Sequence, residues 1–268
     1  MTFATYLAPI FVTIFLWWGL TGLIAWLVGR SKDSYRVALS ISSGIAVAAF
    51  GLLIALKDLT SESAAWLGFG AALALWSWIE LSFLTGWITG PKKTLSKAGV
   101  LGRGGMRHAF DAILAILWHE LAIIAVVASV AVISLDASNR IALYTLLLLW
   151  VMRSSAKLNL FLGVRNLGEI FLPPHLAHLV GYFRQRTMNL LFPFSVLLAS
   201  VLAWQLAERA LAASSSFEVV GFTMLATLAT LALLEHWLMV LPLRAEALWR
   251  WSLANRRHSE AEAWTEGR

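Results

Sequence analysis

Two basic residues, Arg153 and Lys157, lie one helical turn apart inside the apolar run from Ile141 to Leu162. An Arg or Lys at the centre of a membrane-spanning helix costs about 2.5 to 3.5 kcal/mol, so such residues are retained where buried partners compensate them. Other apolar runs supply polar residues that could be those partners: Glu80, His119, Glu120, Glu235 and His236. These seven residues are the candidate site residues.

The candidate residues fall at a common predicted depth. Counting from the end of each apolar run at about 1.5 Å per residue places them roughly 9 to 15 Å from the inner boundary of the membrane. If the helices that carry them are neighbours, three Glu nearly balance Arg and Lys, and the side chains form one buried network. Five of the fourteen tryptophans lie near the same depth: Trp17, Trp18, Trp76, Trp78 and Trp118.

Three interpretations of this network remain open. It could be structural and only fix the register of the helices. It could be a ligand pocket, because a His and carboxylate cluster with aromatic walls such as Trp78 and Trp118 would suit a planar apolar ligand, for example a tetrapyrrole held by His119 or His236. It could also be catalytic, since ionisable residues inside a membrane often mark functional sites.

Known enzyme motifs are incomplete in this chain. His119-Glu120 begins like a zinc protease helix, but Ile123 stands where the second His would be needed. The inventory of three Glu and two His matches a di-iron carboxylate site, but it lacks the Glu-x-x-His spacing, and two basic residues would repel the metals. The last apolar run has no Lys for a retinal Schiff base, and with no Cys there is no thiolate chemistry. An enzyme is therefore the less favoured prediction.

The composition predicts an all-α polytopic membrane protein. The chain has 268 residues, of which 59% are hydrophobic and 13% charged, and its mean hydropathy is +0.75. Seven runs are long enough to cross a hydrocarbon core of about 30 Å. They span approximately residues 6–28, 37–56, 65–88, 109–133, 141–162, 188–207 and 219–241.

The basic residues predict the orientation. They concentrate in the first, third and fifth connections and in the tail, whereas the alternate connections hold only Lys57, Arg140 and Arg209. Because basic loops remain cytoplasmic, we expect the N-terminus outside and the C-terminus in the cytoplasm. The net charge of +6 then indicates topology and attraction to anionic lipid, and no nucleic-acid partner is expected.

No connection exceeds about 25 residues, so the sequence predicts no separate soluble domain. Residues 1–243 should form the seven-helix transmembrane domain, and residues 244–268 a cytoplasmic interfacial helix followed by a disordered tail. After Pro173 and Pro174, one helical face carries Leu176, Leu179, Val180 and Phe183, which predicts an amphipathic helix on the inner surface. Ser40, Gly44 and Ala48 predict close approach of the second helix to a neighbour.

Several long blocks resemble one family. They are LWVMRSSAKLNLFLGVRN from Leu149 to Asn166, FLPPHL, YFRQRTMNLLFPFSV, WSWIELSFLTGWITGP from Trp76 to Pro91, HEL from His119, and LEHWLMVLPL. Together they resemble the photosynthetic complex assembly proteins of the PuhE type, found in purple phototrophic bacteria with the reaction-centre genes. The similarity covers most of the chain. Pro174 departs from it, because that family usually has an acidic residue there.

The resemblance implies a membrane protein that helps to build the reaction-centre and light-harvesting assembly or regulates its pigment supply. The motif positions carried over are the seven candidate residues and Asn159. We therefore expect an assembly factor of the bacterial inner membrane, cytoplasmic or intracytoplasmic, with lipid and reaction-centre and light-harvesting subunits as partners. Bacteriochlorophyll, haem or a tetrapyrrole precursor is the candidate ligand. The alternatives are a docking scaffold with a structural charge network, and an intramembrane enzyme of tetrapyrrole or quinone chemistry.

Overall fold

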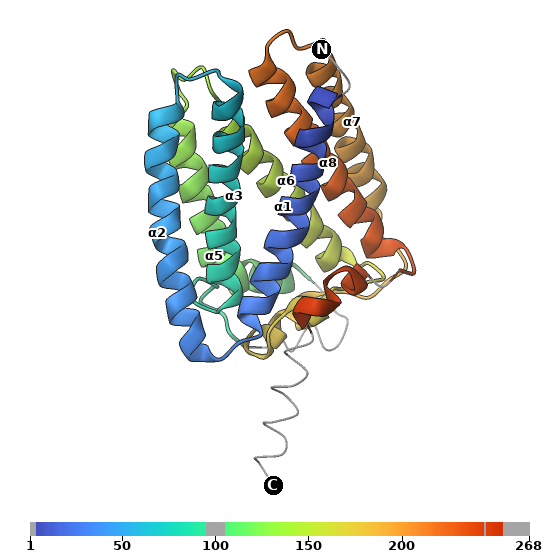
Figure 1. Ribbon diagram of the computed structural model, residues 1–268. Helices are drawn as coiled ribbons and strands as arrows, with labels where there is room; N and C mark the ends of the chain where they lie inside the picture. The colour runs from blue at the N-terminus through green and yellow to red at the C-terminus, as the bar shows by residue number, and fades with distance from the viewer. Residues whose placement is uncertain (1–3, 95–104, 244, 254–268) are drawn as a thin grey trace.

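Seven long helices make up most of the part of the protein that the structure describes (Figure 1). The computed structural model describes residues 4–94, 105–243 and 245–253. The helices are α1 (Ala4–Val28), α2 (Lys32–Leu56), α3 (Glu62–Leu84), α5 (Met106–Ile133), α6 (Ile141–Leu162), α7 (Phe192–Ala212) and α8 (Ser216–Val240). All seven are long and apolar enough to cross a membrane. The prediction of an all-α bundle with seven transmembrane helices is confirmed.

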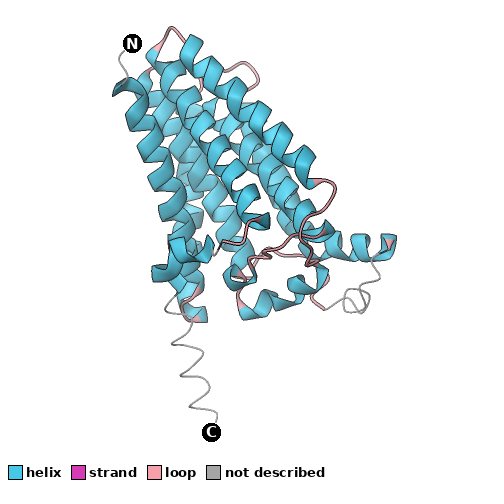
Figure 2. Ribbon diagram, turned by 90° about the vertical axis from the view of Figure 1, so that its right-hand side faces the viewer, coloured by secondary structure: helices cyan, strands magenta, loops and turns pink. Residues whose placement is uncertain are grey.

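Helix α3 lies at the centre of the bundle. Of its most apolar stretch 56% is buried, against 17% for α1, α2 and α7. It contacts α1, α2, α5, α6 and α8, while the other six helices follow one another around it in the order α1, α2, α5, α6, α7, α8. Figures 1 and 2 show these helices running side by side. Side chains on α3 therefore meet partners from several directions.

Three helices differ from the sequence prediction by four or five residues. The second helix was expected to begin at residue 37, but α2 begins at Lys32. The sixth helix was expected over 188–207, but α7 begins at Phe192 and ends at Ala212. The Asn189 side-chain oxygen accepts hydrogen bonds from the backbone N–H of Leu191 and Phe192. These bonds form a turn over residues 189–191, and the helix begins only after it. The third helix was expected to reach residue 88, but α3 ends at Leu84, because Gly86 adopts a left-handed φ of 81°.

Short helices gather at one end of the bundle, the lower end in Figures 1 and 2, which we call the loop-rich end. They are η1 (Glu169–Phe171), η2 (Pro174–Tyr182) and η3 (Ala245–Trp249). The segment predicted as an amphipathic surface helix is the 3-10 helix η2. Its Leu176 and Leu179 are buried in a cluster with Phe83 and Ala115, so the segment closes the bundle end and does not lie free on the membrane surface.

The residues after α8 pack against α1. The Trp18 indole N–H donates to the carbonyl of Leu248, and the Trp249 indole N–H donates to the carbonyl of Trp18. Trp249 and Leu253 are buried, whereas Leu248 and Trp251 are exposed. Two of these four apolar residues, Trp249 and Leu253, thus face the bundle. The predicted disordered tail lies outside the described residues.

The prediction for the small residues of α2 is wrong. Ser40, Gly44 and Ala48 are not buried, and a Cβ added to Gly44 would meet no atom within 4 Å. The buried face of α2 carries Ala46 and Ala49 instead. Small side chains occur on both faces of this helix, so their spacing alone did not identify the contact face.

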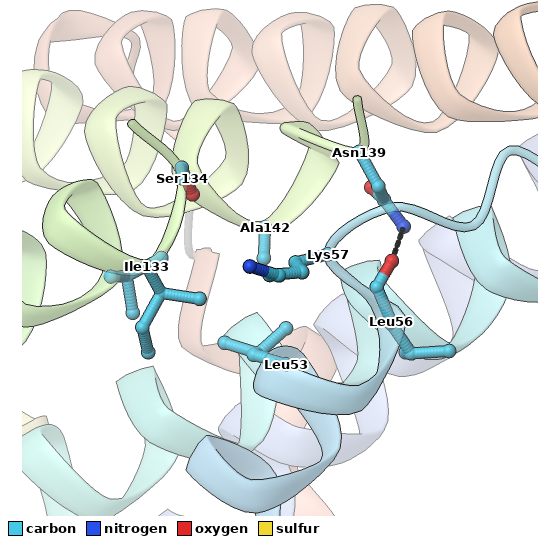
Figure 3. A pocket seen from close by; sticks show the side chains of 8 residues that line it. Leu53, Leu56, Lys57, Ile133, Ser134, Asn139 and Ala142 are labelled. Atoms are coloured by element: carbon cyan, nitrogen blue, oxygen red, sulfur yellow. Dashed lines mark hydrogen bonds between the residues drawn. The ribbon is translucent and has the colours of Figure 1, made fainter. Parts of the chain in front are cut away.

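The opposite end of the bundle is tightly closed. The Asn139 backbone N–H donates to the carbonyl of Lys57, and its side-chain amide donates to the carbonyl of Ala64. The same amide donates to the carbonyl of Leu56 (Figure 3). The cavity beside it measures about 10 Å³. That volume is at the lower limit for one water molecule. A ligand site is therefore not expected beside Asn139.

Candidate functional site

Helix α6 carries polar side chains on two opposite faces. A helix advances about 100° per residue, so Arg153 and Lys157 share one face, and Ser155 and Asn159 share the other. The first face meets α3 and α5, and the second meets α8 and α7. The network predicted from the sequence is therefore divided by α6 into two parts.

Each basic residue of α6 pairs with one carboxylate. The Arg153 guanidinium lies 3.0 Å from Glu80 Oε2 on α3, and Lys157 Nζ lies 2.5 Å from Glu120 Oε1 on α5. Both pairs join helices, which matches the expectation that intramembrane partners compensate the two bases. Because a pair inside a membrane avoids the cost of a lone charge, these contacts fix α6 against α3 and α5.

His236 lies on the other side of α6, in contact with Ser155. Its Nε2 is 2.9 Å from the Ser155 hydroxyl, and its Nδ1 is 2.8 Å from the carbonyl of Ala232. Both ring nitrogens are therefore engaged. Since His119 faces the charged side of α6 and His236 the uncharged side, the two candidate imidazoles do not share a pocket.

His119 is enclosed and without polar partners. Its ring is 0% exposed and lies 4.3 Å, centroid to centroid, from Phe83. Neither ring nitrogen has a hydrogen-bond partner within the described part of the chain. The charges of Lys157, Arg153 and Glu120 act on the ring electrostatically. A buried polar group without a partner costs about 1 to 3 kcal/mol, so His119 is the least satisfied group of the site.

The tryptophans named as pocket walls do not line the charged network. The Trp78 indole donates to the Ser43 hydroxyl on α2, and Trp118 is 51% exposed on the outside of α5. Trp17, another of the five tryptophans expected at this depth, does contact a candidate residue. Its indole N–H donates to Glu235 Oε1 at 2.7 Å, across the contact between α1 and α8.

The uncharged face of α6 continues into an amide network. The Asn159 amide donates to the Ser195 hydroxyl on α7. The buried Asn189 amide donates to the side-chain oxygen of Asn159 and to the carbonyls of Asn159 and Gly163. The sequence interpretation carried Asn159 over from the family and missed Asn189. Asn189 lies at the start of the predicted run 188–207 and shortly before Pro193, and an Asn followed by Pro at the first helical turn is a cap signal that could have identified it.

Asn189→Ala should destabilise the protein by about 2 to 3 kcal/mol, because it removes the cap of α7 and leaves the buried Gly163 carbonyl without that donor. SDS-induced unfolding in mixed micelles would measure the loss. The matched control is Met188→Ala at an exposed neighbouring position, where a change within about 0.5 kcal/mol is expected. Equal midpoints for the two variants would contradict the role of this amide.

As arranged, the candidate ligands do not fit a tetrapyrrole. An axial ligand needs an open nitrogen beside a space for the macrocycle, but the His119 ring is fully enclosed and His236 has both nitrogens engaged. Among the described residues, no group of three or more His, Asp or Glu converges as a metal site would require. Pigment binding remains a prediction, and it would require rearrangement around His119.

Comparison with known proteins places the chain in a family. The family model described as "Protein of unknown function (DUF3623)" matches residues 3–260. A protein of Rhodobacter capsulatus, named "Uncharacterized 30.4 kDa protein in puhA 5'region", is 38% identical over 247 residues, which cover 90% of this chain and 88% of the relative. No solved structure matches the chain. The protein is a multi-pass, all-α membrane protein, and the chain belongs to the DUF3623 family.

Proposed function

We propose that this protein is an integral membrane assembly factor for photosynthetic complexes, and that it acts as a docking scaffold. The name of the Rhodobacter capsulatus relative, which refers to the puhA region, supports a role linked to photosynthesis genes. The resemblance of the blocks around Arg153 and Glu235 to the PuhE-type assembly proteins supports the assembly role. Reaction-centre and light-harvesting subunits are the proposed partners.

The pairing of the intramembrane charges is the observation that favours a scaffold over a pigment carrier. Arg153 and Lys157 each have a carboxylate partner from a neighbouring helix, and both imidazoles are closely surrounded by protein. Such a network stabilises one arrangement of the helices, in which neither imidazole is open to a macrocycle. A rigid bundle that presents fixed surfaces to nascent subunits suits a scaffold.

We further propose that the protein lies in the bacterial inner membrane with the loop-rich end in the cytoplasm. This end carries most of the basic residues next to helix ends: Arg30, Arg36, Lys92, Lys93, Arg107, Arg165, Arg184, Arg186 and Arg250. Lys57, Arg140 and Arg209 lie at the other end. The excess of basic residues at the loop-rich end supports this orientation.

Single histidine substitutions test the scaffold role. In a phototrophic host that lacks the native gene, His236→Ala and His119→Leu should restore assembled reaction-centre and light-harvesting complexes to at least roughly half of the wild-type level, because a scaffold does not need an axial ligand. Absorption of the membranes in the near infrared measures assembly. Loss of complexes in either variant, with the variant protein present at its normal amount, would contradict the scaffold role.

Pigment handling is the second candidate, and the two unpaired nitrogens of His119 favour it. Its test is the absorption spectrum of the protein purified in mild detergent from phototrophic membranes. Stoichiometric tetrapyrrole bands that disappear in His119→Leu would establish this role, while a colourless, folded protein would support the scaffold.

A further inference from the structure

Arg153 and Glu235 are exposed although each lies on the inner face of its helix. Arg153 follows the buried Ala142 and Leu146 at spacings of eleven and seven residues, which return to nearly the same helical direction. Yet 42% of the Arg153 side chain is exposed.

Glu235 repeats this pattern on α8. It follows the buried Met224 and Leu228 at the same two spacings, yet it is exposed. Two side chains that lie on inner helix faces and remain exposed indicate that the neighbouring helices leave these positions open. We call the residues Trp17, Glu80, Arg153 and Glu235 the recess group.

The recess group contains polar atoms that the protein's own hydrogen bonds do not fully engage. Arg153 has five N–H donors, of which one contacts Glu80 Oε2 at 3.0 Å. The other oxygen of Glu80, Oε1, is buried and has no hydrogen-bond partner in the described residues, and the whole residue is 8% exposed. Glu235 accepts from Trp17, and the charges of Arg153 and Glu80 both act on it.

The recess group is acidic overall. Glu80 and Glu235 outnumber Arg153, and the nearby Lys157 is engaged with Glu120. Ionisable groups at membrane depth face water-filled cavities or partner groups, because exposure to lipid is costly. Glu235 lies five residues before the end of α8, or about 8 Å from it. Lipid headgroups remain at the interface, whereas a long Lys or Arg side chain on a helix reaches polar groups at that depth.

We propose that the recess group is a hydrated intramembrane site that accepts an ammonium or guanidinium group from a basic side chain of a partner's transmembrane helix. The exposed Glu235 carboxylate accepts its hydrogen bonds, beside the Arg153–Glu80 pair. The proposed scaffold function supplies the partner, and this site would be where the partner's helix is recognised. Hydration and charge preference of the recess are properties of the free protein.

Cysteine labelling tests the recess in the purified full-length protein, because the chain has no native Cys. Met239→Cys places a thiol one turn from Glu235 at a partly exposed position. In proteoliposomes it should react with methanethiosulfonate reagents, and adding Glu235→Gln should lower the ratio of cationic to anionic reagent rates about tenfold. Leu234→Cys, exposed on the lipid-facing side, should not react. An unreactive Met239→Cys, or an unchanged ratio, would overturn the proposal.

A protection experiment identifies the occupant. The probe is a synthetic polyleucine transmembrane peptide with one Lys about seven residues from its cytoplasmic end, compared with the same peptide carrying Gln. The Lys peptide should slow labelling of Met239→Cys roughly fivefold or more, and Glu235→Gln should abolish the protection. Equal protection by dodecylamine would overturn the helix assignment in favour of a small amphiphilic amine. Absence of protection by the Lys peptide would overturn the site.

The recess and the scaffold role are separate properties of the protein. Labelling uses purified protein and does not depend on photosynthetic assembly. If Met239→Cys does not react in the purified protein while photosynthetic assembly in cells is normal, the site is refuted and the scaffold role stands. A hydrated, cation-selective recess in a protein that proves dispensable for assembly would remove the scaffold role and leave the site.

Discussion

Replacing Glu120 by Ala is expected to lower the free energy of unfolding by about 3 kcal/mol. The substitution leaves the Lys157 ammonium without its carboxylate partner at membrane depth, and removing one member of a buried pair costs about 3 to 5 kcal/mol. Both side chains retain roughly a quarter of their exposure, which places the expected value at the lower end. SDS-induced unfolding in mixed micelles measures it.

The double substitution Glu120→Leu with Lys157→Met should be more stable than either single change. Replacing both members of a buried ion pair by apolar residues is often neutral, because no uncompensated charge remains. The surface pair Lys57–Asp58, 3.9 Å apart and more than half exposed, is the control, and Asp58→Ala should change stability by less than about 0.5 kcal/mol. If the double variant loses as much stability as the two single variants together, the pairing of Lys157 with Glu120 is contradicted.

The same double variant separates a structural from a functional network. If the pair only holds α5 against α6, the double variant should be both stable and active in assembly. If it is stable but assembles no complexes, the charges themselves are used. This comparison is sharper than any single substitution, because single changes at Glu120 or Lys157 alter stability and charge together.

The helices were predictable because hydropathy is a local property. Runs of about twenty apolar residues identify a span whatever its neighbours are, so four of the seven predicted spans agree with the helices to within three residues at each end. The need of Arg153 and Lys157 for intramembrane partners was predictable for the same reason, since the cost of a charge in a bilayer does not depend on the fold.

The division of the site by α6 was not predicted. The spacing of Ser155 and Asn159 was visible in the sequence, but which neighbour lies on each side of α6 depends on packing across the whole bundle. A common depth for His119 and His236 therefore did not imply a common pocket. The exposure of Glu235 was hidden for a related reason, because exposure of an inward-facing residue depends on how closely α1, α6 and α8 approach one another.

The second large effect concerns the segment after α3, which returns against α5. Gly90 lies so close to α5 that an added Cβ would overlap the backbone at Leu114 and Ala115. Beside it, the His119 backbone N–H donates to the carbonyl of Thr89 at 2.9 Å. A side chain at residue 90 must push this segment away from α5, and helix backbone cannot yield as a flexible side chain can.

Gly90→Ala should therefore destabilise the protein by about 3 kcal/mol, near the upper end of overpacking effects. Gly44→Ala is the matched control, because α2 offers open space there, and helix propensity favours Ala by about 1 kcal/mol. In SDS unfolding, the midpoint should be lower than wild type for Gly90→Ala and higher than wild type for Gly44→Ala. Similar midpoints would show that residues 85–91 do not pack against α5. Because the displaced segment includes the partner of the His119 backbone, Gly90→Ala should also open the enclosure of the His119 ring, which faster hydrogen exchange of the His119 amide would detect.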